Sequence, residues 1–441
     1  MEVKLSKENY YINEDGTFNQ IEALKTAGLK AAVCFKPGAI TPWDIRDKES
    51  DAVLIKRGIG TVTADHVTPS QQVPVSLEIY DIPKIICMYL NNLGMQAADE
   101  RSLRYTEVKD NDYLTNEEIE TYNKWMTILQ EVLWNDYHKY FMMSNNNDEK
   151  KAKMAIKKMA QENARSFITV FMPTSLTITS NFSEFNKLAL QIERTINAQN
   201  NTELEELAIP YLKEFLNQLK ELGVVITNHD IWLLDATLDT DLATELKIPN
   251  NDKYLYRDTK GIELNLFASK NKFSGISMPD EFGVSFHATR DISFAGFAQL
   301  QRHRTLKTEL EVRGEEFFVP EFIKSYKELV REWYQDIYKI KNLCYPQGQM
   351  IRVSMEGTLK DLISYIGSER ACNRAQYEIS KFYLELLNDY KENFKNGNPQ
   401  DFFDENYADL ITPYLGVYRC RTKDYKCPTP CPGGPRENRK F

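Results

Sequence analysis

The chain has 441 residues, of which 42% are hydrophobic and 12% aromatic, enough for a large core and more than one domain. Its formal net charge of −9 argues against a general nucleic-acid coat, and no apolar run approaches the roughly 18 residues that a membrane span requires. The N-terminal sequence MEVKLSKENYYINEDG lacks the apolar core of a signal peptide, so we expect a cytoplasmic protein that binds neither membranes nor nucleic acids.

In chain order, the first half begins with a strand in VPVSLEI and a short helix in KIICMYL. A long amphipathic helix is predicted to start at Thr115, because Thr115 and Glu118 match a capping box. An extended segment, FITVFMPTSLTIT, follows, and then helices in SEFNKLALQIERTI and NTELEELAIPYLKEFLNQLKEL. The buried stripe of the long helix is expected at Ile119, Tyr122, Met126, Leu129, Leu133 and Tyr137.

The same order of elements returns after Gly223. A strand in VSFHA precedes an apolar helical segment, ISFAGFAQL, and a second long helix with Pro320 in its first turn. This half ends with an extended segment, CYPQGQMIRVSM, and a final helix, TLKDLISYIGSERACNRAQYEISKFYLELL. In the first half, the polar segment SNNNDEKKAKMA predicts a surface loop. The buried stripe of the second long helix is expected at Phe322, Tyr326, Leu329, Trp333 and Ile337.

This recurrence predicts an internal duplication with a seam near Gly223. We therefore expect an α+β fold of two tandem repeats, residues 1–223 and 224–441, each an antiparallel or mixed sheet packed with long helices.

Seven cysteines in a chain without an export signal are expected to be reduced thiols. Cys420, Cys427 and Cys431 crowd the tail CRTKDYKCPTPCPGG and are weak candidates for a metal site, with Cys344 as a distant fourth ligand. Their spacing is irregular and no histidine lies near, so we favour the interpretation without a metal, an irregular tail rich in proline and glycine.

Four motifs stand in order along the chain. ERSLRY covers residues 100–105, ENARSF contains Arg165, QLQRHR covers residues 299–304, and RACNRAQYEI begins at Arg370. Together they resemble the flavin-dependent thymidylate synthases, whose hallmark is Arg-His-Arg, seven residues, then Ser, written RHR…NExSxRY. The resemblance extends over nearly the whole chain, once per half.

Each half keeps a different part of the family pattern. In the first half Asn92-Leu93-Gly94 replaces Arg-His-Arg, and Ile192 replaces the arginine of the last helix. In the second half Val312 stands at the serine position and Asn342 at the arginine of the "AR" motif. The losses are complementary, so one site between the two halves would contain every part.

The resemblance implies that dUMP binds in this composite site, since guanidinium groups bind phosphate bidentately and stay charged. It implies catalytic roles for Arg302, Arg370 and Ser102, with Arg370 polarising the pyrimidine. The implied substrate-binding residues are Gln299, Arg302, Glu100, Ser102, Arg104, Arg165 and Arg370.

The resemblance also implies FAD as cofactor. The family's HxTPxE motif is echoed with a glutamine in place of glutamate. The implied cofactor-binding residues are His303, Arg304, His66, Thr68, Gln71 and Asn181.

The implied activity is that of a methyltransferase that converts dUMP to dTMP with methylenetetrahydrofolate and NADPH. Two such chains would form a homodimer that acts as a pseudo-tetramer with two complete sites. Two alternatives stay open: flavin-dependent modification of another pyrimidine nucleotide, and a non-catalytic protein that binds a nucleotide or flavin. Individual residues also have structural interpretations, because Arg370 could pair with Glu369 or Glu378, and His66 could be a structural histidine.

Overall fold

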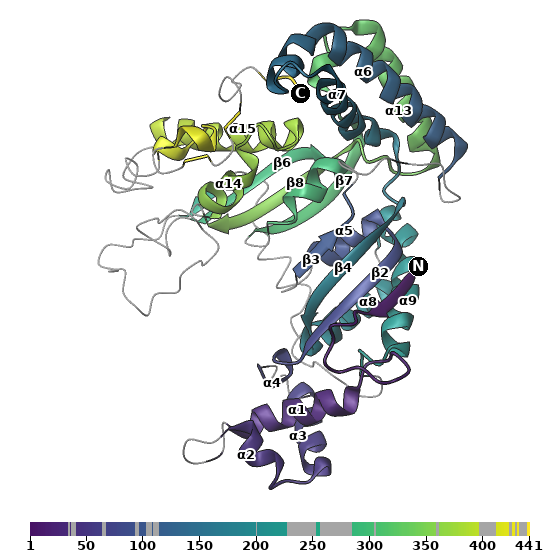
Figure 1. Cartoon of the computed structure of the whole chain (residues 1–441), viewed down its shortest axis with the longest axis vertical. Helices are drawn as coiled ribbons and strands as arrows, with labels where there is room; N and C mark the ends of the chain where they lie inside the picture. Colours follow the sequence, from purple (N-terminus) through teal and green to yellow (C-terminus); the bar gives the residue numbers. More distant parts are fainter. Residues whose placement is uncertain are drawn as a thin grey trace. The chain divides into compact units, whose positions relative to one another are not determined.

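The computed structural model shows two compact units, Met1–Arg101 with Phe171–Lys247 and Ser102–Val170 with Ile248–Phe441 (Figure 1). The residues that it describes are 1–33, 36, 41–63, 68–92, 97–102, 108, 114–199, 201–226, 253–255, 285–303, 306–358, 361–396, 412–422, 426–427, 430–431 and 439–441.

The first unit contains a four-stranded antiparallel sheet with the order β1-β2-β4-β3. On β2 the buried residues Val75, Leu77 and Ile79 alternate with more exposed polar residues, the pattern of a sheet with one face on a core. Leu77 is paired with Ile178 of β4. The strands are β1 (Glu2–Leu5), β2 (Pro74–Pro83), β3 (Ala97–Glu100) and β4 (Pro173–Asn181).

Helices complete the first unit. Two of them, α1 and α3, cross at Gly28 and Gly58, where a Cβ atom on either glycine would meet the backbone of the other helix. Only glycine permits this approach, which buries Leu29 and Leu54. The helices are α1 (Gln20–Val33), α2 (Pro42–Arg46), α3 (Asp51–Thr63), α4 (Thr68–Gln71), α5 (Lys84–Asn92), α8 (Phe182–Asn197) and α9 (Glu203–Glu221).

The second unit contains another four-stranded antiparallel sheet, with the order β5-β6-β8-β7. Helix α15 packs against β6 and α12 (Figure 1). The strands are β5 (Lys253–Leu255), β6 (Ser285–Ser293), β7 (Lys307–Phe317) and β8 (Gln349–Thr358). The helices are α6 (Asn116–Ser144), α7 (Glu149–Ala164), α12 (Phe294–Leu300), α13 (Lys327–Leu343), α14 (Gly367–Arg370) and α15 (Tyr377–Asn396). Shorter helical segments are η1 (Arg165–Phe167), η2 (Glu321–Ile323), η3 (Asp361–Ile366), η4 (Thr412–Tyr414) and η5 (Arg419–Arg421).

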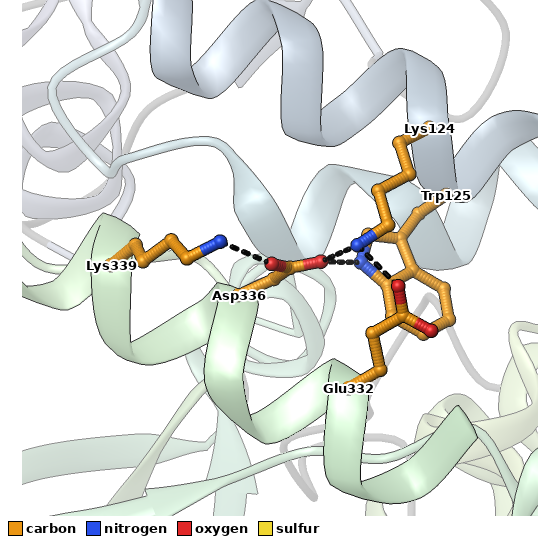
Figure 2. A network of polar contacts seen from close by, with 5 residues as sticks. All are labelled: Lys124, Trp125, Glu332, Asp336 and Lys339. Carbon is orange, nitrogen blue, oxygen red and sulfur yellow. Dashed lines mark hydrogen bonds and ion pairs between the residues drawn. The ribbon is translucent and has the colours of Figure 1, made fainter. Parts of the chain in front are cut away.

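An aromatic core joins α6 to α13. The rings of Trp125, Trp333 and Phe167 lie 4.5–5.5 Å apart between centroids and are fully buried. Beside them the buried Asp336 accepts hydrogen bonds from Trp125 Nε1 (2.9 Å), Lys124 Nζ (2.5 Å) and Lys339 Nζ (2.9 Å), as Figure 2 shows. Both carboxylate oxygens are paired, which compensates the cost of burying the charge. Burial alone would raise the pKa of Asp336, but the hydrogen bonds and the lysine charges outweigh that effect and keep the pKa below its usual value.

The start of α6 confirms the predicted capping box. Thr115 Oγ1 accepts from the Glu118 backbone N–H at 3.2 Å, and the Glu118 carboxylate accepts from the Thr115 backbone N–H at 2.9 Å. Within the predicted stripe the middle positions are buried, while Ile119 and Tyr137 at its ends are partly exposed.

Three local predictions were wrong. The polar segment SNNNDEKKAKMA is mostly helix α7, because Asn146 and Asn147 close α6 with positive φ and Asp148 caps the next helix at once. The second long helix starts only at Lys327, after the short turn η2, so Tyr326 is exposed. The final helix is interrupted at residues 371–376, between α14 and α15.

The expected α+β fold is confirmed, with antiparallel sheets and long helices. Both sheets have the same strand order, each running first, second, fourth and third strand. The boundaries of the compact units differ from those of the predicted repeats, because α6 and α7 belong to the predicted first repeat but lie in the second unit. The seam near Gly223 stays a prediction. Among the described residues, no helix is both long and apolar enough to cross a membrane.

Candidate active site

A buried polar cluster in the second unit joins a residue from the predicted first repeat to residues from the second. Arg165 follows α7 directly and is 5% exposed. Its Nε donates to the Glu162 carbonyl at 3.1 Å, and its Nη2 donates to the Ala295 carbonyl at 3.4 Å and to Gln376 Oε1. The guanidinium is thus aimed at α12 and at the start of α15.

Gln376 connects this arginine to the Arg-His-Arg segment. Its Oε1 also accepts from Nε2 of Gln299, the last residue but one of α12. One amide oxygen therefore holds donors from both predicted repeats. The break after α14 makes this contact, since Gln376 precedes the first turn of α15.

A carboxyl group lies deeper in the same cluster. Glu378 accepts from the Ser293 backbone N–H at 2.7 Å and from Ser293 Oγ at 2.8 Å, and Ser293 Oγ accepts from the Gly296 N–H as N-cap of α12. Burial raises the pKa of Glu378, while the Ser293 hydrogen bonds and the Arg165 charge oppose that rise. The carboxyl group thus anchors α12 to α15.

His303 and Arg370 form a second contact around the Arg-His-Arg segment. Arg370 Nε donates to His303 Nε2 at 2.8 Å, and Arg370 Nη2 donates to the Gln299 carbonyl at 3.2 Å. Burial of the ring and the Arg370 charge lower the pKa of His303 to about 3. The imidazole is therefore neutral, accepts through Nε2 and keeps its proton on Nδ1. Arg370 also pairs with Glu369 at 3.4 Å, as the structural interpretation of this residue expected.

The residues around His303 differ in exposure. Arg302 is exposed, whereas Gln301 is 3% exposed. Within the described part of the chain, neither side-chain amide atom of Gln301 has a hydrogen-bond partner. A buried amide left unpaired costs on the order of 1–3 kcal/mol, so this position is suited to a polar ligand or a bound water.

The other predicted site residues belong to the first unit, to the start of the second unit, or to parts of the chain outside the described residues. Glu100, in the first unit, is buried and pairs with Lys84 Nζ at 2.5 Å, and Ser102 begins the second unit and is partly exposed. Thr68 and Gln71 lie on α4, and Asn181 Oδ1 caps α8 by accepting from the Glu184 N–H at 3.0 Å. Outside the described residues lie His66, Arg104 and Arg304.

The sequence interpretation did not single out Gln376 or Ser293, and it named Glu378 only as an alternative ion-pair partner of Arg370, whereas Glu378 is bonded to Ser293. Gln376 and Glu378 stand in the motif RACNRAQYEI, from which only Arg370 was taken as a site residue. The predicted unbroken helix hid them, because it gave no reason to turn both side chains toward α12. A serine just before an apolar helix is an N-cap signal that would have pointed to Ser293.

The polar cluster combines buried amides, a neutral imidazole and three arginines on adjoining segments. Residues 20–219 match the family model described as "Thymidylate synthase complementing protein". This part of the chain is similar to that family. The matched region includes ERSLRY and Arg165 of the family's pattern, and the resemblance of residues 220–441 stays a prediction.

Two solved structures were compared with the chain. A structure of Thymidylate Synthase X from Helicobacter pylori, solved with FAD and dUMP, is 14% identical, covers 50% of this chain and 93% of its own, and has a TM-score of 0.28. A second structure of the flavin-dependent thymidylate synthase from the same organism, with the same ligands, is 14% identical, covers 50% and 99%, and has a TM-score of 0.27. These scores carry no conclusion about the site. No curated protein matches the chain significantly.

Proposed function

We propose that the protein is a flavin-dependent thymidylate synthase, a methyltransferase that converts dUMP to dTMP in a site built from both halves of its sequence. One observation carries the proposal: Arg165, from the region that matches the family, shares the Gln376 amide oxygen with Gln299. The family pattern is divided between the halves, and here residues from both halves are in contact.

Three arginines are proposed to bind and orient dUMP. Arg302 is exposed, and a guanidinium group binds phosphate bidentately. Arg165 and Arg370 donate to neighbouring backbone carbonyls, which already fix their orientation. Ligand binding would therefore cost little side-chain conformational entropy. Arg370 is proposed to polarise the pyrimidine and Ser102 to assist it, while Glu100 and Arg104 complete the substrate contacts.

FAD is the proposed cofactor, and the unpaired buried amide of Gln301 fits a polar ligand in this region. His303 and Arg304 are proposed to hold it, together with His66, Thr68, Gln71 and Asn181. Bound FAD, once reduced, would supply a hydride, with NADPH as its reductant and methylenetetrahydrofolate as the carbon donor. Neutral His303 adds no positive charge to this region.

The duplication belongs to the same proposal. The shared strand order of the two sheets and the complementary motif losses support two tandem repeats. Two chains would then form a pseudo-tetramer with one complete site per chain rather than one per repeat.

The reaction can be tested with dUMP labelled with tritium at C5. We expect the purified protein to carry FAD absorbance and to release tritium when methylenetetrahydrofolate and NADPH are added. Arg165→Ala should reduce release at least 100-fold, because one charged hydrogen-bonding partner is removed from the site. The matched control is Arg194→Ala, on the exposed side of α8, which should retain activity. Folded protein without flavin and without tritium release would refute the proposal.

A further inference from the structure

A cavity lies between α15 and two segments of the C-terminal tail, residues 412–422 and 439–441, all in the second unit. Its volume is about 380 Å³, within the usual range of small-molecule sites. The wall on α15 is one helix face, since Tyr377, Ser380, Lys381 and Leu384 follow each other at intervals of three and four residues. Glu378, which anchors α12 in the polar cluster, is not part of this wall. The cavity and the polar cluster therefore lie on different faces of α15.

The tail forms the opposite wall and is fixed there by close contacts. Gly416 has a φ of 69°, and a Cβ atom at this position would overlap a side chain of α15. The Arg419 N–H donates to the Ala371 carbonyl at 2.9 Å, and the buried Arg439 donates through Nη2 to the Ala375 carbonyl at 2.7 Å. Among the residues that the structure describes, no three metal-binding side chains are grouped, including the tail cysteines considered from sequence, Cys420, Cys427 and Cys431. Hydrogen bonds on both sides of the cavity thus hold its walls in place.

Positive charge predominates among the described side chains of the wall. Three of them are cationic, Lys381, Arg421 and Arg439, and one, Glu385, is anionic. Lys381 also forms long ion pairs, 3.6 Å to Glu321 and 3.8 Å to Glu385, so the two guanidinium groups are the cations best suited to an anion. A phosphate monoester, with a charge of about −1.5 to −2 at pH 7, matches two guanidinium groups better than a carboxylate does.

Hydroxyl groups add neutral donors to the same wall. Ser380 is 1% exposed, and within the described part of the chain its Oγ has no hydrogen-bond partner. A buried hydroxyl that stays unpaired destabilises the fold, so its place in a cavity wall points to a polar ligand. Burial and the charges of Glu321 and Glu385 raise the pKa of Tyr377 to about 12, so its phenol keeps its proton and can donate to an anion.

The rest of the wall suits a ring. Leu384, Val417 and Tyr418 give it apolar and aromatic surface. The Arg439 guanidinium lies 5.7 Å from the centroid of the Tyr377 ring, a cation–π contact that orients both groups at the wall. Apolar surface beside cationic groups fits a ligand with one charged end and one ring-containing end.

We propose that this cavity binds a small phosphate monoester with a ring-containing body, about the size of a nucleoside monophosphate. The phosphate would be bound by Arg421 and Arg439 and would accept a hydrogen bond from Ser380 Oγ, and the ring would pack against Tyr418 and Leu384. This site is additional to the proposed dUMP site and does not depend on the thymidylate synthase activity.

Titration calorimetry of the full-length protein with adenosine monophosphate tests the proposal. Arg421→Glu should weaken binding about 10-fold or more, because a charge-assisted contact to the phosphate is replaced by repulsion. Arg421 is exposed, so this change should leave the fold intact. The matched control is Arg331→Glu, the same charge reversal at an exposed ion pair of α13, which should keep the affinity. Ser380→Ala should weaken binding without lowering stability, since it removes a hydroxyl that is unpaired in the free protein.

A second pair of measurements assigns the bound ligand to this cavity. Arg302→Ala, which removes a proposed dUMP contact, should keep binding of adenosine monophosphate, and Arg421→Glu should keep tritium release from dUMP. Binding that is lost in Arg302→Ala but kept in Arg421→Glu would overturn the proposal, as would wild-type protein that does not bind the probe. Inorganic phosphate that binds as tightly as adenosine monophosphate would exclude an ester site. Because the readout is heat of binding, failure of the synthase proposal leaves this test unchanged.

Discussion

At the scale of single residues, the cluster around Gln376 shows how the chain keeps charged groups inside a core. The Arg165 guanidinium is buried, yet its donors meet two carbonyls and an amide oxygen. His303 next to Arg370 stays neutral, since two positive charges at 2.8 Å in a buried region would repel. Burial, together with the Arg370 charge, therefore keeps the imidazole of His303 neutral.

The protonation state of His303 predicts a dependence of stability on pH. Its pKa is about 3 in the folded protein and near 6.5 when unfolded, so between these values the unfolded chain binds the extra proton. The free energy of unfolding should thus be unaffected by this group above pH 6.5 and fall by up to about 1.4 kcal/mol per pH unit below it. Urea unfolding from pH 7 to 5 should show a shallower decline in His303→Gln. Equal slopes in both proteins would contradict a buried neutral imidazole.

At the scale of elements, two contacts between helices organise the second unit. The Trp125–Trp333–Phe167 core fixes α6 against α13, and Asp336 ties their edges together. The second contact, Glu378 to Ser293, fixes α15 to the start of α12. Both use a buried carboxyl group that accepts several hydrogen bonds, which restricts each helix pair to one register.

The Asp336 contact predicts a graded set of stabilities. Asp336→Ala should lower the free energy of unfolding by about 2–4 kcal/mol, because the buried Trp125 N–H loses its acceptor and two ion pairs are lost. Asp336→Asn should cost less, since an amide oxygen still accepts from Trp125. The control Glu332→Ala removes only a partly exposed partner of Lys124 and should change stability by less than about 1 kcal/mol. Urea denaturation measures all three, and equal losses would argue against a buried network.

At the scale of the whole molecule, the proposed duplication has a specific consequence. Arg165 and Gln299, which belong to different predicted repeats, donate to the same Gln376 oxygen within one chain. Fusing two copies into one chain would allow each copy to lose the residues that the other supplies.

Mixing two inactive variants tests this arrangement. Arg165→Ala and Gln299→Ala chains, co-expressed with different affinity tags and isolated as mixed dimers, should stay inactive and fail to bind dUMP. If both residues of a site come from one chain, every site in the mixture carries one defect. Recovery of about half the wild-type sites in the mixed dimer would show that the site is shared between chains. Titration of the wild-type protein should find one dUMP per chain.

Local information in the sequence determined the elements and the motifs. Thr115 and Glu118 cap α6 through bonds that span three residues, and the alternation of Val75, Leu77 and Ile79 marks β2 whatever the rest of the fold. Helix ends governed by backbone conformation, as at Asn146 and Asn147, were misplaced, because polar residues fit a loop and a capped helix equally well.

Only the tertiary structure decided which distant residues meet. Arg165 is more than two hundred residues from Gln376, and Ala371 after α14 accepts a hydrogen bond from the Arg419 N–H of the tail. Neither pairing leaves a periodic signal, since both depend on the break after α14 that turns residues 371–376 toward α12 and the tail. Hydrogen bonds within a few residues are encoded locally, whereas buried polar contacts form only once packing has brought their segments together.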